Sequence, residues 1–253
     1  METKVTVQGD GWGVLLHPEW RDKLLEQGVS ADQGLSPVLF TSEYYQSQAQ
    51  RVGAGGRNAA WFIPTPVGPA VLRQYRRGGL VGRFNRSKYF FKSPEQTRSF
   101  QEFAIINYLH GAGLTVPKAL AAFYQRQGLF CEMALITSLV GDTVPLATIC
   151  QQFIDKVIDQ KTAEDYVRIT AQRVRQMHDL GVWHADLNAY NILCTQASIE
   201  AYLIDFDKAQ KLTLSDTLRQ KNLDRLQRSL LKVCGQQSIV FMEQISHYYH
   251  QFE

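Results

Sequence analysis

The sequence has few cysteines, no long apolar segment and one long stretch without any acidic residue. Its four cysteines lie far apart and form no C-x-x-C pair, which argues against both a zinc site and a disulfide framework. No segment reaches the roughly 20 apolar residues that a membrane-spanning helix needs, and the N-terminus lacks a basic segment followed by an apolar one. We therefore expect a protein of a reducing compartment that is neither exported by a standard signal nor membrane-spanning.

The acid-free stretch lies between Arg51 and Pro94 and is rich in positive charge. Its nine basic residues are Arg51, Arg57, Arg73, Arg76, Arg77, Arg83, Arg86, Lys88 and Lys92. The whole chain has a net charge of +3, so these nine positive charges leave −6 on the remainder. Such a block predicts an anionic partner: nucleotide phosphates, an anionic lipid surface, nucleic acid or a phosphorylated substrate.

Two common nucleotide-binding motifs are also missing. The sequence contains neither the G-x-x-x-x-G-K-[ST] motif of P-loop proteins nor a Rossmann fingerprint after a strand. At 253 residues with 45% hydrophobic content, the chain is long enough to bury one sizeable core or two small lobes around a cleft. A nucleotide would therefore have to bind through another architecture.

The most informative motif runs from His184 to Asn191 and reads HADLNAYN. It matches the protein-kinase catalytic loop, H-R-D-L-x-x-x-N, in which the Asp accepts the proton of the attacking hydroxyl and the Asn holds a metal ion. Asp186 and Asn191 keep the five-residue separation of that motif. Asp205 follows Asn191 by 14 residues, which fits a short hairpin that delivers a metal-binding carboxylate, as the D-F-G motif does in kinases. The pattern predicts phosphoryl transfer, with Asp186 as catalytic base and Asn191 and Asp205 as Mg²⁺ ligands.

Each of these residues also has an ordinary structural explanation. An Asp or Asn near a turn usually bonds to the backbone, and a lone His is usually a core or surface residue. The joint pattern favours the kinase interpretation, because all of these positions match the motif and apolar segments at 192–193 and 201–204 read as supporting strands.

Hydrophobic periodicity predicts an α+β protein with a strand-rich first lobe. Strands are expected within residues 38–52, 61–63, 70–75, 119–124 and 130–137, the last two as a hairpin around a Gln-Gly turn. A helix is expected from a capping box at Ser93 to about Leu109. Its apolar stripe consists of Phe100, Phe103, Ile106 and Leu109.

The second half of the sequence predicts a helical lobe. One helix is expected at residues 162–180, ended by Gly181, and another after Asp207 with an apolar stripe of Leu223, Leu226, Leu230 and Val233. This order of elements is that of a protein-kinase-like two-lobed fold. We expect a single domain, with residues 1–137 as N-lobe and residues 138–253 as connector and C-lobe.

A kinase-like N-lobe should hold the nucleotide phosphates through a glycine-rich hairpin and a basic residue on a strand. Gly53, Gly55 and Gly56 would let the backbone approach phosphate oxygens, although the third spaced glycine of the kinase motif is missing and a glycine cluster is often only a hairpin turn. Arg73 stands where the kinase motif V-A-I-K has Lys. Arginine binds phosphate bidentately, with a different geometry from lysine.

The fold also requires an acid on the N-lobe helix and a connector that contacts adenine. Glu95 lies in the expected first helical turn, where the helix dipole already explains a carboxylate. We therefore choose Glu102, for which the alternative is a solvated surface charge. The connector contributes Thr137 and Leu139, whose backbone groups should contact adenine.

Beyond the kinase motif, the chain resembles the 3-deoxy-D-manno-octulosonic acid (Kdo) kinases of Gram-negative bacteria, relatives of the lipopolysaccharide core heptose kinases. The resemblance spans nearly the whole chain from Gly53 onward. It is carried by the 184–191 loop, by the Asp205-Phe206-Asp207-Lys208-Ala209 sequence in place of D-F-G, by the LRQYRRGGL block at residues 72–80, and by the NLxRLxRSL pattern at residues 222–230.

The resemblance implies ATP-dependent phosphorylation of the Kdo 4-hydroxyl on a lipid A precursor, at the cytoplasmic face of the inner membrane. The residue chemistry agrees with a small or lipid-linked acceptor, because no A-P-E motif follows Asp207 and only 46 residues remain after it. The Kdo carboxylate and the lipid A phosphates would give the basic block a use, and Arg76, Arg77 and Arg83 are the candidate substrate residues.

Two alternatives stay open at this point. One is another phosphotransferase of the same fold, such as a heptose, antibiotic or RIO-type protein kinase. The other is a non-catalytic scaffold that binds nucleotide or nucleic acid.

The expected partners are ATP, Mg²⁺, the Kdo-lipid A precursor and, peripherally, the anionic inner-membrane surface. We expect no nucleic acid and no obligate protein partner.

Overall fold

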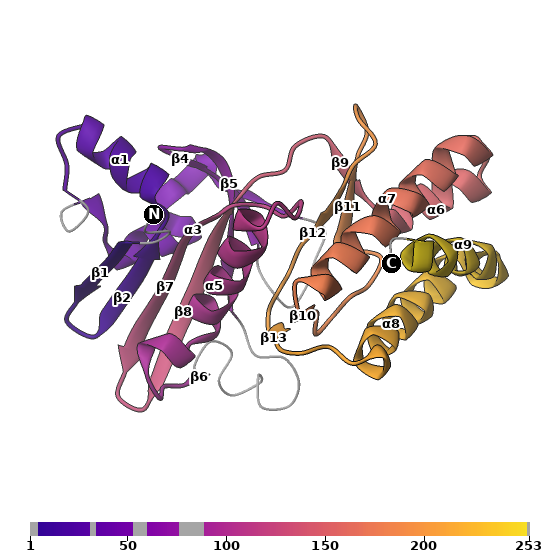
Figure 1. The fold of residues 1–253 in the computed structure, drawn as a ribbon. Coiled ribbons are helices and arrows are strands. Elements are labelled where there is room, and N and C mark those ends of the chain that lie inside the picture. Colours follow the sequence, from indigo (N-terminus) through magenta and orange to yellow (C-terminus); the bar gives the residue numbers. More distant parts are fainter. Residues whose placement is uncertain (1–4, 31–33, 53–59, 76–88, 252–253) are drawn as a thin grey trace. The chain divides into compact units, whose positions relative to one another are not determined.

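A computed structural model describes the chain except for residues 1–4, 31–33, 53–59, 76–88 and 252–253. The chain divides into two compact units (Figure 1). Unit 1 comprises Met1–Asn107 and Lys118–Leu139, and unit 2 comprises Tyr108–Pro117 and Val140–Glu253. The division lies two residues beyond the predicted boundary at 137. In addition, residues 108–117 belong to unit 2, where the Tyr108 hydroxyl donates to the Leu180 carbonyl oxygen at 3.0 Å.

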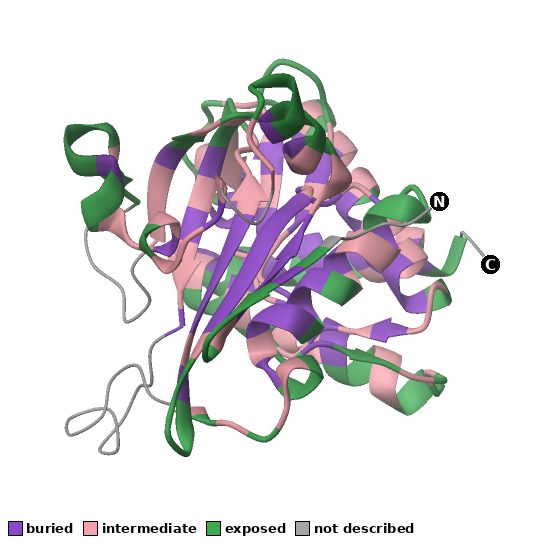
Figure 2. Cartoon of the chain, turned by 90° about the vertical axis from the view of Figure 1, so that its left-hand side faces the viewer, coloured by how far each residue is buried: buried purple, intermediate pink, exposed green. Residues whose placement is uncertain are grey.

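Unit 1 is built on an antiparallel sheet whose hydrogen-bonded order is β1-β2-β7-β8-β5-β4-β3, with β6 also paired to β8. The strands are β1 (Val5–Gly9), β2 (Trp12–Leu16), β3 (Gln50–Arg51), β4 (Ala60–Thr65), β5 (Gly68–Gln74), β6 (Tyr89–Phe90), β7 (Ala119–Gln127) and β8 (Phe130–Ser138). The helices are α1 (Pro18–Glu26), α3 (Ser42–Tyr45) and α5 (Arg98–Gly111). The central strands carry the buried residues of the sheet (Figure 2). The predicted hairpin is confirmed as β7 and β8, and Gly128 in its turn has the positive φ of 63° that glycine adopts most readily.

The expected strand within residues 38–52 is wrong apart from the short β3. The structure has the 3₁₀ helices Pro37–Phe40 and Gln46–Gln48 on either side of α3. Packing explains the difference. Phe40 stacks on Phe123 with ring centroids 4.5 Å apart, and the buried Tyr45 donates from its hydroxyl to the Leu39 carbonyl oxygen at 3.0 Å. The tertiary contact with Phe123 and this local hydrogen bond override the strand propensity of the segment.

The start of the N-lobe helix is also corrected. Ser93 precedes a 3₁₀ turn, Pro94–Gln96, and makes no side-chain capping bond, whereas α5 begins at Arg98. Thr97 separates the two, because it is extended and its hydroxyl donates to the Pro94 carbonyl oxygen at 2.6 Å. The predicted stripe is confirmed, since Phe100, Phe103, Ile106 and Leu109 are all buried.

Unit 2 is mainly helical. Its helices are α6 (Leu146–Ile154), α7 (Gln160–Asp179), α8 (Asp216–Cys234) and α9 (Ser238–Gln251). Two small sheets accompany them: β12 (Ala201–Leu203), β11 (Ile192–Thr195) and β9 (Thr143–Pro145) form one, and β10 (Val182–Trp183) and β13 (Gln210–Lys211) form the other. The described residues thus confirm the predicted α+β class, with a strand-rich first part and a helical second part.

The predicted helices of unit 2 are present with small shifts. The helix expected at residues 162–180 is α7, which begins two residues earlier because Asp159 caps it by accepting from the Thr162 N–H at 2.7 Å. On α8, Leu223, Leu226 and Leu230 are buried as expected, whereas Val233 is half-buried. In the described ranges, no helix is both long and apolar enough to cross a membrane.

Candidate active site

The candidate catalytic loop, residues 184–191, lies in unit 2 between β10 and β11. His184 at its start is fully buried and does not face outward. Its Nδ1 accepts from the Asp186 N–H at 3.1 Å, so its Nε2 carries the proton and donates to the Ile204 carbonyl oxygen at 3.0 Å. Burial lowers the pKa of His184, which keeps the ring neutral in this role. His184 is therefore a structural residue of the loop.

Asp186 presents its carboxylate at the surface of the loop. The side chain is 55% exposed, and its Oδ1 lies 2.8 Å from Nη1 of Arg225 on α8. The backbone of Asp186 is held from both sides, because its N–H donates to His184 and its carbonyl oxygen accepts from Nδ2 of Asn191 at 2.9 Å. The carboxylate is thus positioned by the loop while it stays accessible to an acceptor hydroxyl.

Asn191 lies at the other end of the loop and points its amide back across it. Its Nδ2 donates to the Asp186 carbonyl oxygen. Its Oδ1 can therefore coordinate a metal ion or accept a hydrogen bond. Asn188 closes the turn by accepting from the N–H groups of Tyr190 at 2.8 Å and Asn191 at 3.2 Å. The Asn191 carbonyl oxygen accepts from the Ile204 N–H at 3.0 Å. This bond places Asn191 beside the residue that precedes Asp205.

Asp205 lies two residues after the end of β12 and adopts a positive φ of 61°, a conformation that Asp tolerates better than most residues. Phe206, the next residue, is buried, and its ring lies 4.9 Å from that of His184. Ile204 is bonded to both ends of the catalytic loop, because its carbonyl oxygen accepts from His184 and its N–H donates to the Asn191 carbonyl oxygen. The structure thus brings Asn191 together with Asp186 through its side-chain amide, and with the residue before Asp205 through its carbonyl oxygen.

A chain of buried polar groups supports the loop from behind. Asn222 of α8 bonds to both backbone groups of His184 and accepts from Nε2 of His178 at 3.1 Å. His178 Nδ1 in turn accepts from the Tyr249 hydroxyl at 2.7 Å. Burial lowers the pKa of His178 to about 4, so this ring is neutral. The chain links α7, α8 and α9 to the start of the catalytic loop.

In unit 1, Arg73 of β5 and Glu102 of α5 form the expected ion pair. Glu102 is 2% exposed and also accepts from the hydroxyl of Tyr75, whose pKa burial raises well above its ordinary value. The guanidinium of Arg73 lies 4.8 Å from the centroid of the Tyr75 ring. Glu95, the rejected candidate, is exposed. The pair ties α5 to β5, and its role in phosphate binding stays a prediction.

Of the connector residues, Thr137 lies near the end of β8 and Leu139 lies just beyond it. Thr137 pairs with Val71 and Ala119, and the Leu139 N–H already donates to the Pro69 carbonyl oxygen at 3.0 Å. An adenine contact by Leu139 would therefore use its carbonyl oxygen. The predicted phosphate-binding glycines Gly53, Gly55 and Gly56 and the predicted substrate residues Arg76, Arg77 and Arg83 lie outside the described residues.

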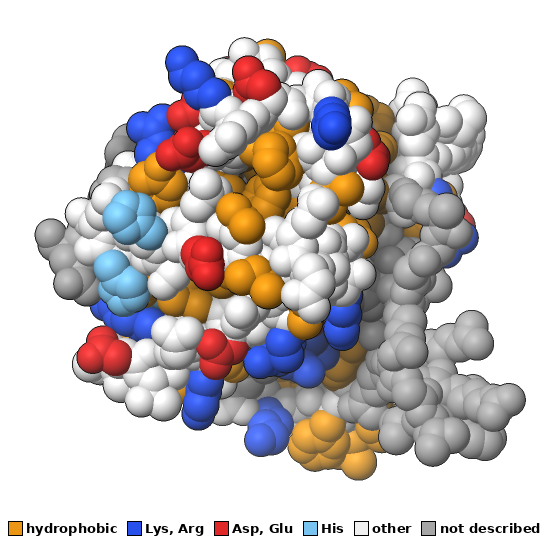
Figure 3. Space-filling model, turned by 90° about the vertical axis from the view of Figure 1, so that its right-hand side faces the viewer, with side chains coloured by type: hydrophobic (Ala, Val, Ile, Leu, Met, Phe, Trp, Pro, Cys, Tyr) orange, Lys and Arg blue, Asp and Glu red, His pale blue; other side chains and the backbone are white. Residues whose placement is uncertain are grey.

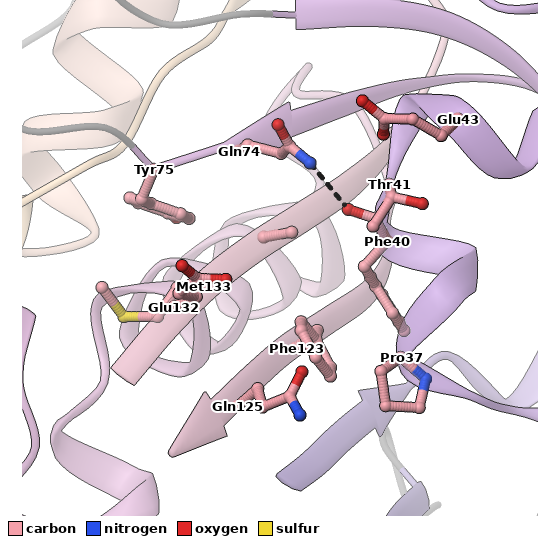
Figure 4. A pocket seen from close by; sticks show the side chains of 11 residues that line it. Pro37, Phe40, Thr41, Glu43, Gln74, Tyr75, Phe123, Gln125, Glu132 and Met133 are labelled. Atoms are coloured by element: carbon pink, nitrogen blue, oxygen red, sulfur yellow. Dashed lines mark hydrogen bonds between the residues drawn. The ribbon is translucent and has the colours of Figure 1, made fainter. Parts of the chain in front are cut away.

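The sheet of unit 1 also bears a hollow of about 420 Å³, away from most of the predicted site residues. It lies between the strands and the 37–43 segment, where Nε2 of Gln74 donates to the Phe40 carbonyl oxygen at 3.2 Å (Figure 4). Of the residues around the Arg73–Glu102 pair, Tyr75 alone lines this hollow. Nothing in its lining matches the phosphate chemistry of the kinase motif.

The sequence from residue 42 to residue 248 matches the model of the lipopolysaccharide kinase (Kdo/WaaP) family. The chain belongs to this family. It is 40% identical over 203 residues to the 3-deoxy-D-manno-octulosonic acid kinase of Vibrio vulnificus (strain YJ016), a match that covers 80% of this chain and 82% of that protein. It is 34% identical over 232 residues to the enzyme of the same name from Stenotrophomonas maltophilia (strain K279a), which covers 92% and 86%.

A solved structure titled "WaaP in complex with acyl carrier protein" shares the fold, with a TM-score of 0.62 at 18% sequence identity. The match covers 94% of this chain and 88% of that one. The Kdo/WaaP family membership and this likeness confirm the predicted kinase-like fold and the predicted phosphotransferase activity in lipopolysaccharide core biosynthesis. They decide against a non-catalytic scaffold. Kinase activity carries with it the use of ATP.

Two supporting residues of this Kdo/WaaP kinase had no assigned role in the sequence. Asn222, Leu226 and Leu230 recur at intervals of four and therefore share one helix face. A polar residue on this otherwise apolar, buried face was the sequence signal that could have indicated a supporting role for Asn222. Arg225 gave no such signal, because an arginine on an amphipathic helix is ordinarily a solvated charge. Its pairing with Asp186 depends on the tertiary fold.

The donor set of the kinase loop fits a Mg²⁺ ion. Oδ1 of Asn191 and the carboxylate of Asp205 are hard oxygen ligands, and Mg²⁺ is commonly held by one or two carboxylates together with substrate phosphates. Across the described ranges no group of three or more His, Cys, Asp or Glu side chains could hold a metal by itself.

Proposed function

We propose that this chain is an ATP- and Mg²⁺-dependent kinase that phosphorylates the 4-hydroxyl of Kdo on a Kdo-lipid A precursor. The observation that carries the proposal is the loop geometry of unit 2, in which the accessible Asp186 carboxylate is fixed beside Asn191, whose carbonyl oxygen accepts from the N–H of Ile204, the residue before Asp205. The relatives named Kdo kinases, at 34–40% identity, support Kdo as the acceptor sugar over the heptose that the broader family also suggests.

In the proposed reaction, Asp186 accepts the proton of the Kdo 4-hydroxyl. The hydroxyl oxygen forms a bond to the γ-phosphorus of ATP, the bond to the β,γ-bridging oxygen breaks, and ADP leaves with the bonding electrons. Asn191 and Asp205 would hold Mg²⁺, and such an ion would stabilise the negative charge that develops on the transferred phosphoryl group. Arg225 orients Asp186 through its ion pair.

We further propose that the enzyme works at the cytoplasmic face of the inner membrane as a peripheral protein. The acid-free basic block from Arg51 to Pro94 supports this, because cations near an anionic leaflet are attracted to it. Binding to the membrane surface would bring the enzyme close to its proposed lipid-linked acceptor, because that acceptor is anchored in the bilayer.

The test is an acceptor assay with the full chain. Purified protein is incubated with Mg-ATP and Kdo-lipid A precursor, and the product is weighed and fragmented to locate the added phosphate. We expect one phosphoryl group on the Kdo 4-hydroxyl, and none on an acceptor in which that hydroxyl is replaced by hydrogen. Transfer only to a heptose-containing core would replace the proposal by a heptose kinase.

The metal assignment has its own test, Asp205→Asn. Asn adopts positive φ as readily as Asp, so this variant removes the charge and keeps the backbone conformation. We expect a sharply raised Mg²⁺ requirement. Identical Mg²⁺ dependence of the variant and the wild type would show that Asp205 is not a ligand.

A further inference from the structure

A hollow of about 340 Å³ opens directly beside Asp186 in unit 2. The catalytic loop contributes one wall and α8 the other, and the lining residues are Asp186, Asn188, Arg225, Arg228, Ser229 and Lys232. The α8 residues recur at intervals of three and four, so they share one face of the helix. The catalytic carboxylate and a row of cations therefore border the same space.

The walls of this hollow are fixed to each other. The Ser229 hydroxyl accepts from the Ala189 N–H at 3.1 Å, and Nη1 of Arg225 lies 2.8 Å from Oδ1 of Asp186. Both bonds join the middle of the catalytic loop to α8. The part of α8 that carries the cations is thus held at a set place relative to the carboxylate that receives the acceptor proton.

The charge of the hollow is strongly positive. Arg225 is engaged by Asp186, whereas Arg228 and Lys232 are exposed, and no carboxylate in the described part of the chain is paired with either of them. In Figure 3, Lys and Arg side chains gather in the lower half of the face that unit 2 presents. Once Arg225 and Asp186 are matched, two positive charges remain in the hollow.

Helix energetics do not account for this arrangement. Like charges three or four residues apart repel each other by a few tenths of a kcal/mol. The helix dipole favours Lys232, which lies in the last turn of α8, but its effect does not extend to Arg225 and Arg228 further in. Three cations on one face beside a catalytic loop are therefore explained better by an anionic ligand than by the stability of α8.

We propose that this hollow binds the anionic group of the acceptor, and that Arg228 and Lys232 hold the Kdo carboxylate there. The inference rests on the proposed function and deepens it. In Kdo the carboxylate is attached to C2, two ring bonds from the C4 hydroxyl, so an acceptor that places this hydroxyl against Asp186 carries its carboxylate into the adjoining space. An arginine fork and a lysine are the side chains that bind such a group.

The variants that test this are Arg228→Gln, Lys232→Gln and their combination. Because both side chains are exposed, the variants should fold like the wild type, which thermal denaturation checks. We expect the double variant to raise the acceptor KM roughly tenfold or more, as loss of charged hydrogen bonds does, with the ATP KM unchanged. Lys161→Gln, an exposed lysine at the start of α7, is the matched control and should leave both constants unchanged. An acceptor KM within twofold of wild type in the double variant would overturn the inference.

Modified acceptors distinguish the source of the anion. If the site holds the Kdo carboxylate, reduction of that carboxylate to an alcohol should raise the wild-type KM and abolish the difference between wild type and double variant. If the difference instead disappears on an acceptor that lacks the lipid A phosphates, the hollow is an anion site for a lipid phosphate. A difference that persists on both acceptors contradicts an anion site. Wild-type protein that phosphorylates no Kdo acceptor would reject the proposed function itself, a result distinct from these.

Discussion

Asn222 and His184 bind each other through two hydrogen bonds. Oδ1 of Asn222 accepts from the His184 N–H at 3.1 Å, and Nδ2 donates to the His184 carbonyl oxygen at 2.8 Å. A side-chain amide of α8 thus satisfies both backbone groups of a fully buried residue, as a neighbouring strand would. This contact fixes the catalytic loop two residues before Asp186.

We expect Asn222→Ala to lower the free energy of unfolding by about 2–4 kcal/mol, because it leaves both backbone groups of His184 and Nε2 of His178 without these partners in a buried site. It should also lower kcat, since the position of Asp186 depends on His184. Chemical denaturation and steady-state kinetics measure the two effects. Gln220→Ala, which removes only a surface bond to Asp224 on the same helix, is the control and should change stability by less than about 0.5 kcal/mol. Equal stability of the two variants would contradict the role of Asn222.

The neutral His178 predicts a pH dependence of stability. Its pKa is about 4 in the folded protein, against the usual 6.5, so between these values the unfolded chain binds a proton that the folded chain does not. Stability should therefore fall as the pH is lowered from about 6.5 to 4, by about 3 kcal/mol at most from this residue. Unfolding measured across this range should show a shallower slope for His178→Gln, and an unchanged slope for the exposed His110→Gln. A wild-type stability that is constant between pH 6.5 and 5 would contradict this.

The Asp186–Arg225 pair predicts coupled effects on turnover. Asp186→Ala should reduce kcat by about 10²–10⁴-fold while ATP binding stays nearly intact, because a general base acts on the acceptor. Arg225→Gln should reduce kcat less, since it removes only the group that orients Asp186. In the double variant the Arg225 substitution should add nothing, because the carboxylate it orients is gone. Independent losses that multiply in the double variant would show that Arg225 acts elsewhere.

The catalytic loop could be predicted because its chemistry is encoded in consecutive residues at fixed spacing. Asp186, Asn191 and Asp205 lie where the motif requires, and their supporting strands, β11 and β12, follow from short apolar segments. The buried apolar stripe of α5 could likewise be predicted from the helical spacing of its apolar residues. In contrast, the segment at residues 38–52 was predicted as a strand, whereas short helices form in its first part, where Phe40 packs on Phe123 and Tyr45 bonds to Leu39.

The supporting residues were harder to predict, because their function depends on contacts between distant parts of the sequence. Asn222 lies 38 residues from His184, and Tyr249 lies 71 residues from His178. The burial of Glu102 likewise could not be predicted from the sequence. Sequence alone left a solvated surface charge as the alternative, whereas the fold buries the carboxylate against Arg73 and Tyr75.

The basic block predicts salt-dependent membrane binding. Arg73 is already paired with Glu102, and we expect part of the remaining basic block to attract an anionic leaflet, with about 1 kcal/mol for each cation that lies near the surface. Co-sedimentation with anionic vesicles should decrease as salt shortens the Debye length. It should decrease further when the five central cations are replaced by Gln, namely Arg76, Arg77, Arg83, Arg86 and Lys88. Lys156→Gln with Lys161→Gln is the control outside the block. Equal binding to neutral and anionic vesicles would reject electrostatic docking.

The Arg73–Glu102 pair allows structural and nucleotide roles to be separated. Arg73→Met should destabilise unit 1 by about 3–5 kcal/mol, because it leaves the Glu102 carboxylate buried without its cation. Adding Glu102→Leu should restore much of that stability, since the uncompensated charge is removed. If Arg73 also binds ATP phosphates, the ATP KM should stay raised in the restored double variant. The exposed Arg51→Gln is the control for loss of an arginine in the same unit. Strictly additive stability losses would show that the two residues are not coupled, and a wild-type ATP KM in the stable double variant would reduce Arg73 to a structural role.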